Sequence, residues 1–422
     1  MVYYQGGSSN GQFTTEKLKK GLFEALDKLG SRHKVLVIPP DFTRFHSRAG
    51  MLTEMVWEYY GDAVTDILPA LGTHAPMSSG EITRMFGKVP HSLFRVHDWR
   101  NDVVTLGVVP GTFIREISGN SVGYPWPAQV NKMIAQGGHD LILSIGQVVP
   151  HEVIGMANYN KNLFIGTGGK EAIDKSHFLG AAYGMERIMG RADNPVRKVL
   201  NYAAEKFAVH LPVVYIHTVI GKNESGSTVV KGLFAGDDIS CFNDAAELSL
   251  RLNFELLEEP LHKIVVFLDP LEFKSTWLGN KGIYRTRMAL ADGGELILMA
   301  PGLKHFGEDK DIDRLIRKYG YRSTTKILQL VREENELRDN LGAAAHLIHG
   351  STEDRFHVTY CPGHLSRQET ESVNFLYADL QSMLKKYDPA KLKDGYNEVN
   401  GERIYYISNP ALGLWASKNR FF

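Results

Sequence analysis

The sequence has few cysteines, no net charge and no long apolar run. Its two cysteines, Cys241 and Cys361, are too few for a disulfide framework and are not spaced as a metal-binding knuckle. The 48 basic and 48 acidic side chains cancel, so nothing attracts nucleic acid or an anionic membrane over long range. No run of about twenty apolar residues could span a bilayer, and the first residues lack the pattern of a secretory signal. We therefore expect a soluble, cytoplasmic protein.

The sequence does contain an alternation of helix-like and strand-like stretches. Residues 15–30 and 50–61 have the apolar spacing of helices, and KVLVIPP at 34–40 is a β-branched run. Such alternation favours βαβ units with a mostly parallel sheet. Further strand-like runs occupy 62–74, 139–151, 162–169 and 211–221.

A second cycle of strands and helices begins near residue 262. Residues 253–262 are charged, contain a proline and suggest a hinge, while 325–349 and 370–387 each have the pattern of one long helix. We predict an α/β fold of two domains, with Rossmann-like, mostly parallel sheets and an active-site cleft between them. The first domain would span 1–262 and carry the cofactor motifs, and the second would span 263–395 and close over the substrate. Residues 396–422 are a candidate return to the first domain.

Polar residues follow several of the predicted strands. The sequence DFTR, from Asp41 to Arg44, follows the first strand, and His74 and His151 each end a later one. Ligands of open α/β sheets bind beyond the carboxyl ends of the strands. Imidazole suits acid–base catalysis near neutral pH, and Arg44 offers a fork for a carboxylate or phosphate. The ordinary interpretation of Asp41 and Thr43 is a helix cap.

A lysine and a second histidine continue this series: Lys161 lies ten residues after His151, and His177 lies sixteen further on. The two histidines could bind zinc, although no nearby carboxylate or cysteine lies at the spacing expected of a third zinc ligand. Lys161 fits a phosphate-binding lysine, a Schiff-base lysine or a solvated loop residue. From the residues alone, two alternatives stay open: a divalent-metal hydrolase or lyase using His151 and His177, and a non-catalytic nucleotide- or sugar-binding protein. The GTGG turn suits close approach to a phosphate through Gly166, Gly168 and Gly169.

Taken together and in this order, the motifs resemble the lactate racemase family, whose enzymes use the nickel-pincer nucleotide cofactor. The pattern is DxTR, then GTH, then PH with a lysine ten residues on, then a histidine sixteen further. The resemblance runs through most of the chain. It implies a racemase or epimerase that inverts C2 of a small 2-hydroxy acid by hydride transfer. It also implies cofactor-maturation proteins as partners.

The resemblance assigns a role to each matched residue. Lys161 matches the lysine that holds nickel pyridinium-3,5-bisthiocarboxylic acid mononucleotide through a thioamide, and His177 matches the nickel-binding histidine. His74 and His151 match the acid–base pair on opposite faces of the substrate. The remaining matches are Arg44 and Lys281 on the substrate side, and Asp41 and Thr43 in the motif next to the cofactor.

Three segments depart from the family pattern. Ala157, Asn158 and Tyr159 stand where the family often has a serine and two glycines, and Trp277-Leu278 replace a tyrosine and a glutamine. Phe45 follows Arg44 where proline is usual. These differences favour a polyhydroxylated acid such as an aldonic acid over lactate, with Asn158, Tyr159 and Trp277 lining the pocket.

Overall fold

The computed structural model describes residues 1–411 and 413–421 and contains two compact units. Unit 1 comprises Met1–Ser176 and Gly190–Asn253, and unit 2 comprises His177–Met189 and the chain from Phe254 onward. The division falls inside helix α6 (Lys170–Tyr183), directly before His177. The boundary between 253 and 254 lies nine residues before the expected one at 262/263.

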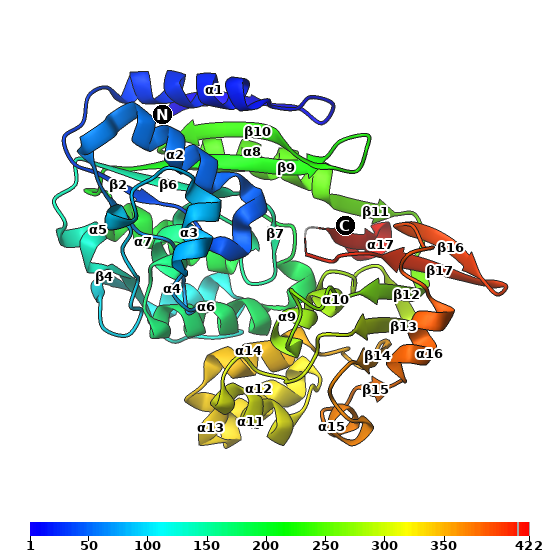
Figure 1. The fold of residues 1–422 in the computed structure, drawn as a ribbon. Helices are drawn as coiled ribbons and strands as arrows, with labels where there is room; N and C mark the ends of the chain where they lie inside the picture. Colours follow the sequence, from blue (N-terminus) through cyan, green and yellow to red (C-terminus); the bar gives the residue numbers. More distant parts are fainter. Residues whose placement is uncertain (412, 422) are drawn as a thin grey trace. The chain divides into compact units, whose positions relative to one another are not determined.

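Unit 1 is built on a six-stranded sheet. Its strands are β1 (Val2–Gly7), β2 (Val35–Ile38), β3 (Val64–Ile67), β6 (Leu141–Gln147), β9 (Val213–Lys222) and β10 (Thr228–Gly236). The order is β1-β10-β9-β6-β2-β3 (Figure 1). The four strands from β9 to β3 are parallel, and β10 and β1 extend the sheet antiparallel. Every residue of β2 and β6 is buried, which explains their unbroken apolar runs.

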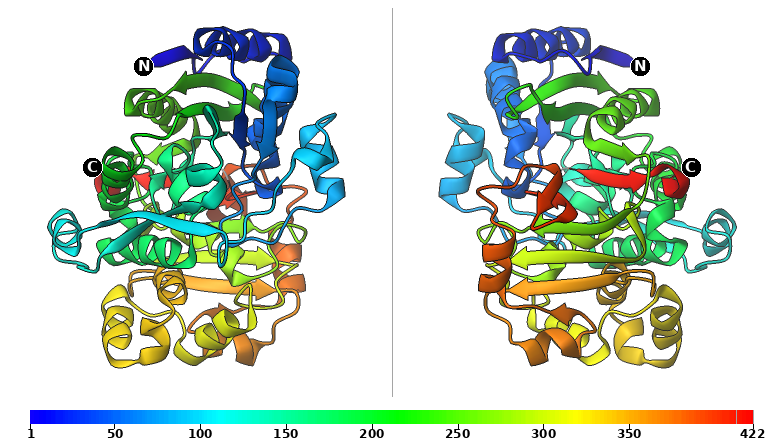
Figure 2. Two further views of the ribbon diagram at one scale, coloured as in Figure 1. Left: turned by 90° about the vertical axis from the view of Figure 1, so that its left-hand side faces the viewer. Right: turned by 90° about the vertical axis from the view of Figure 1, so that its right-hand side faces the viewer.

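Helices cover both faces of this sheet. On one face, α1 (Thr15–Leu29) and α2 (Ala49–Tyr60) pack Leu22, Leu26 and Leu52 against the sheet, with α1 running beside β10 (Figures 1 and 2). On the other face, α8 (Ile239–Asn253) presents Phe242 to the rings of Tyr159 and His217. The other elements of unit 1 are η1 (Phe42–Ser47), η2 (Gly61–Ala63), α3 (Ser79–Phe86), η3 (His91–Leu93), β4 (Val103–Val109), α4 (Gly111–Ile117), β5 (Trp126–Asn131), α5 (Lys132–Gln136), β7 (Pro150–His151), β8 (Gly155–Met156), η4 (Asn162–Gly166) and α7 (Pro195–Phe207).

Unit 2 has a sheet of its own. Its strands are β12 (Leu261–Phe267), β13 (Leu290–Ala300), β14 (His357–Pro362), β15 (Leu376–Tyr377), β16 (Gly395–Val399) and β17 (Glu402–Ile407). The order is β15-β14-β13-β12-β17-β16, and only β16 is antiparallel to its neighbour. The α/β class and the mostly parallel sheets are therefore confirmed. The helices are η5 (Met185–Arg187), α9 (Thr276–Gly279), α10 (Lys281–Tyr284), α11 (Lys310–Tyr319), α12 (Thr324–Glu333), α13 (Asn335–Arg338), α14 (Leu341–His349), α15 (Arg367–Ser372), α16 (Leu380–Lys386) and α17 (Lys418–Phe421).

The C-terminal segment belongs to unit 2 instead of returning to unit 1. Strand β17 pairs parallel with β12, and β18 (Leu414–Ser417) pairs with β11 (Phe254–Leu257). The expected hinge at 253–262 therefore contains a paired strand. Within the described ranges, none of the helices combines the length and hydropathy needed to cross a bilayer.

Three further expectations about local structure are wrong. The run 162–169 is the π-helical turn η4 and a bend instead of a strand, because Thr167 donates its hydroxyl back to the carbonyl of Leu163. The stretch 325–349 is three helices, since Asn340 caps a new helix by accepting from the amide of Ala343. The stretch 370–387 is broken at Asn374, whose φ of 69° ends α15.

Candidate functional site

Three predicted site segments of unit 1 follow the carboxyl ends of β2, β3 and β6. These strands are adjacent and parallel, in the order β6-β2-β3. A bridge between Pro40 and Ala70 extends the β2–β3 register past the strand ends. The register therefore brings the DFTR turn and the His74 turn together, although they lie more than thirty residues apart.

Asp41 connects these two turns through both carboxylate oxygens. Its Oδ1 accepts from the amide of Thr43 at 3.2 Å and from its hydroxyl at 2.5 Å, so the helix-cap interpretation is confirmed for Asp41, while Thr43 lies inside η1. Its Oδ2 lies 2.5 Å from Nδ1 of His74. Burial alone would raise the pKa of Asp41, but the bonds from His74 and Thr43 and the charge of Arg44 hold it below the usual range. A carboxylate only accepts, so neutral His74 donates from Nδ1 and keeps Nε2 free of a proton.

His151 has the opposite tautomer. It lies in β7, and only 6% of its surface is exposed. Its Nδ1 accepts a hydrogen bond from the amide of Val153 at 3.1 Å, with a Glu152 carboxylate oxygen 3.7 Å away. A neutral imidazole that accepts at Nδ1 carries its proton at Nε2. In their neutral forms the two imidazoles thus differ at Nε2, which is an acceptor in His74 and a hydrogen-bond donor in His151.

Lys161 directly precedes η4 and is partly buried. Burial lowers its pKa to about 8, and the positive charge of Arg44 adds to this effect, while Glu152 and Asp41 oppose it. Within the described part of the chain, its Nζ forms no hydrogen bond or ion pair. A substantial fraction of such an amine is neutral near physiological pH, the form that attacks an electrophile.

The GTGG turn is tied to the His74 turn, because the amide of Gly72 donates to the carbonyl of Gly166 at 2.8 Å. The glycines are also required by packing. A Cβ on Gly168 would lie 1.9 Å from a backbone oxygen, and one on Gly169 would lie 2.4 Å from the side chain of Gln129. Close packing therefore explains these glycines, and their contact with a phosphate stays a prediction.

Asn158 and Tyr159 are buried, at 3% and 8% exposure. The Asn158 amide binds the His217 ring at 2.9 Å, and the Tyr159 ring stacks on Phe242 with centroids 5.3 Å apart. These contacts hold the loop before Lys161. The predicted contact of the two residues with substrate stays a prediction.

The remaining substrate-side residues lie in unit 2. Trp277, in α9, stacks on the ring of His346 with centroids 4.5 Å apart. Lys281 begins α10, with Nζ 3.9 Å from a Glu272 oxygen and 5.5 Å from the ring centre of Phe273. Their substrate roles stay predictions.

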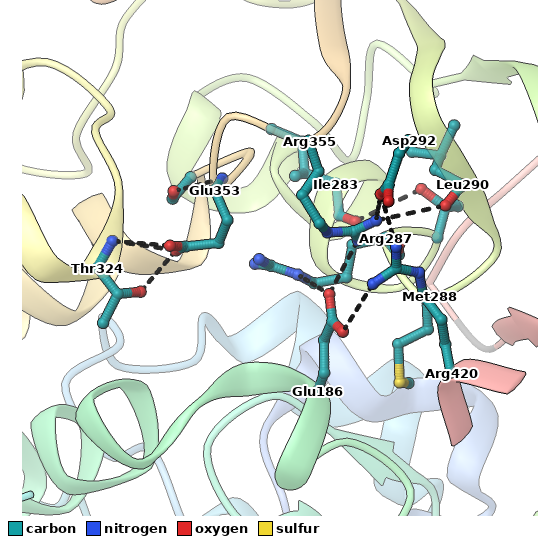
Figure 3. A network of polar contacts seen from close by, with 12 residues as sticks. Glu186, Ile283, Arg287, Met288, Leu290, Asp292, Thr324, Glu353, Arg355 and Arg420 are labelled. Carbon is teal, nitrogen blue, oxygen red and sulfur yellow. Dashed lines mark hydrogen bonds and ion pairs between the residues drawn. The ribbon is translucent and has the colours of Figure 1, made fainter. Parts of the chain in front are cut away.

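His177 is the first residue of the segment 177–189, which belongs to unit 2. Near its other end, Glu186 accepts from Arg355 at 2.9 Å and from Arg287 at 3.4 Å, with Arg420 at 3.9 Å (Figure 3). This ion-pair network attaches the segment to unit 2. Across the described residues, no group of three or more histidine, cysteine, aspartate or glutamate side chains could by itself hold a metal ion.

Sequence reasoning missed Glu152 and Arg197. Glu152 is next to His151, and its charge acts on Lys161. Arg197 contacts the loop before Lys161 from α7, 41 residues from Met156 in the chain. The local sequence around Arg197 is that of an ordinary amphipathic helix, so no signal pointed to it.

Comparisons with known proteins show a matching family model and matching folds. Residues 23–187 match the family model of the lactate racemase N-terminal domain. A crystal structure of a Thermotoga maritima protein matches with a TM-score of 0.82 and 25% identity, covering 98% of this chain and all of that one. The lactate racemase apoprotein from Thermoanaerobacterium thermosaccharolyticum matches with a TM-score of 0.70 and 18% identity, covering 98% of this chain and 94% of that one. No curated protein matches the sequence significantly.

Proposed function

We propose, from the match of residues 23–187 to the family model of the lactate racemase N-terminal domain, that this chain is an isomerase inverting C2 of a 2-hydroxy acid. The observation that carries the proposal is Lys161, an amine with a lowered pKa and no ionic partner in the described chain. It lies in the same unit as the Asp41–His74 pair and His151. A tethering amine together with two imidazoles would be the donor set that this chemistry needs.

The chemistry explains why two histidines are required. Removing a proton from C2 would place a second negative charge beside the carboxylate, so we propose that hydrogen leaves C2 as hydride. The hydroxyl proton must then be taken on one side of the substrate and given back on the other. We propose that His74 takes this proton at Nε2 and that His151, in its protonated imidazolium form, returns a proton from Nε2, each contact being worth about 10²–10⁴ in rate.

Two basic residues would bind the substrate carboxylate. Arg44 provides the planar fork that suits a carboxylate, and Lys281 is proposed as a second cation. Holding the carboxylate lets the 2-keto acid intermediate turn without leaving. Asn158, Tyr159 and Trp277 depart from the family pattern, so we propose an aldonic acid rather than lactate as substrate.

We propose a nickel-pincer nucleotide as the cofactor. Lys161 would hold the group covalently through Nζ, and His177 would bind nickel, which suits imidazole together with soft sulfur ligands. Asp41 and Thr43 would lie beside the group, and the GTGG turn is our candidate for its phosphate. The chemistry that such a group supplies is the acceptance and return of hydride at a ring carbon.

The direct test uses protein produced together with cofactor-maturation proteins and substrates labelled with deuterium at C2. Hydride transfer predicts inversion with the deuterium retained at C2, and faster turnover of an aldonic acid than of lactate. Loss of the label to solvent would contradict the hydride route. Hydrolysis or elimination supported by zinc or magnesium alone would instead favour the divalent-metal alternative.

A further inference from the structure

A buried arginine forms several hydrogen bonds with the loop that leads to Lys161. Arg197, in α7, is 1% exposed. One of its terminal nitrogens donates to the carbonyl of Met156 at 2.7 Å, and the other donates to the side-chain oxygen of Asn160. Both also lie 3.3 Å from the carbonyl of Asn158. A single guanidinium thus binds three residues of the stretch 156–160, which we term the Lys161 loop.

The Lys161 loop has a backbone that needs such support. Asn158 and Tyr159 are consecutive residues with φ of 70° and 59°, in the left-handed region. That region is unfavourable for a residue with a Cβ, and tyrosine lacks the short polar side chain that lowers this cost for asparagine. The loop therefore relaxes to another conformation unless its contacts outweigh this cost.

Helix α7 holds the loop at two points one turn apart. The Asn160 amide donates to the side-chain oxygen of Asn201 at 2.7 Å, four residues beyond Arg197. The guanidinium also lies over the ring of Phe242, 4.3 Å from its centre, in a cation–π contact. An ammonium at position 197 would keep the charge, but it lacks the planar fork that reaches acceptors in several directions.

Arg197 is an expensive residue to bury. Within the described chain no carboxylate pairs with it, and burial lowers its pKa to about 9. Burying a charge without a counterion is costly, and the backbone oxygens of the loop are its main compensation. The hydrogen bonds to the Lys161 loop therefore explain why an arginine is buried at position 197.

We propose that Arg197 is a positioning residue for the Lys161 amine, because it keeps the Lys161 loop in its left-handed conformation and so sets where Lys161 lies. The inference rests on the proposed function only for what becomes attached to that amine. The charged groups acting on Lys161 are Arg44, Glu152, Asp41 and Arg197 itself.

The test uses apoprotein and two readouts. Competitive acylation of Lys161 by acetic anhydride, followed by mass spectrometry across pH, gives the titration midpoint of the amine, expected near 8 in the wild type. Hydrogen exchange reports the amides of the Lys161 loop. In Arg197→Met and Arg197→Lys we expect the midpoint to rise by about one pH unit or more toward the ordinary lysine value, and loop exchange to accelerate by about ten-fold or more.

The two variants separate geometry from charge. Arg197→Lys keeps the charge, so a purely electrostatic role predicts a midpoint near 8 in that variant and would overturn the inference. Unchanged midpoint and exchange in folded Arg197→Met would also overturn it. The matched control is Lys198→Met, since Lys198 is exposed on the same helix and pairs with Asp193 at 3.4 Å. It should change neither readout.

A milder variant covers the case in which Arg197→Met does not fold. Asn160→Ala removes one acceptor and the bond to Asn201, and it should shift both readouts in the same direction by less. No shift in folded Asn160→Ala would contradict the inference. Failure of the proposed function has a different result. Wild-type protein produced with maturation proteins would then carry no adduct on Lys161, while the Arg197 variants would still change the titration midpoint and the loop exchange.

Discussion

The Nδ1 atom of His74 lies 2.5 Å from Oδ2 of Asp41. Because this carboxylate fixes the tautomer of the proposed base, Asp41→Asn should lower turnover by about 10²–10⁴-fold, measured as inversion by cofactor-loaded enzyme. The matched control is Asp66→Asn, since Asp66 pairs with His139 at 3.1 Å in the same unit. An equal loss of turnover in both variants would contradict the assigned role.

The opposite tautomers of His74 and His151 predict opposite defects. Each alanine variant should abolish inversion, yet each should still release 2-keto acid from the enantiomer whose hydroxyl proton is taken by the remaining histidine. Trapping the keto acid with phenylhydrazine in a single turnover measures this. Equal trapping from both enantiomers in both variants would show that the histidines do not divide the two faces.

The Glu186 network should hold the segment that begins with His177. Glu186→Gln weakens contacts to three arginines and should cost about 1–3 kcal/mol of local stability. It would appear as faster hydrogen exchange in residues 177–189. Asp292→Asn is the control, because Asp292 contacts Arg355 and Arg420 but its side chain is 69% exposed, and it should leave the exchange of residues 177–189 unchanged. Equal hydrogen-exchange protection of residues 177–189 in both variants would show that Glu186 does not hold this segment.

His217 predicts a pH dependence of stability. Its burial, aided by the charge of Arg197, lowers its pKa to about 3. Above about pH 6.5 neither the folded nor the unfolded state binds the proton. Below it only the unfolded state does, so stability should fall by about 1.4 kcal/mol per pH unit until the folded pKa is reached.

The variant His217→Gln should lose this part of the slope between pH 6.5 and 4 in urea unfolding, while the buried His97 and His346 contribute their own part in every variant. His210→Gln, at an exposed position, should keep it. The same slope in all three proteins would mean that His217 is protonated equally in both states.

Much of the framework was predictable from local pattern. Buried parallel strands such as β2 and β6 have unbroken apolar runs, and polar residues follow their carboxyl ends, so Asp41, His74 and His151 could be found together. The tautomers could not be found, because they depend on the side-chain contact with Asp41 and the amide of Val153.

The misses share a physical cause. The run 162–169 has the composition of a strand, but its backbone is set by the Thr167 side chain and by close glycine packing. Arg197 contacts residues of the Lys161 loop that are far from it in the sequence. The left-handed residues 158 and 159 are not glycines, so the sequence gives no sign of their conformation. Tertiary contacts decided each of these features over local propensity.

The central claim is the covalent role of Lys161, and intact-mass spectrometry tests it most directly. Wild-type protein and Lys161→Ala would both be produced with the maturation proteins, with Lys170→Ala as a control, because Lys170 is an exposed lysine that pairs with Asp174. We expect a mass increment in the wild type and in Lys170→Ala that is absent from Lys161→Ala and maps to Lys161. Equal increments in all three proteins, or none in any of them after maturation, would contradict the account.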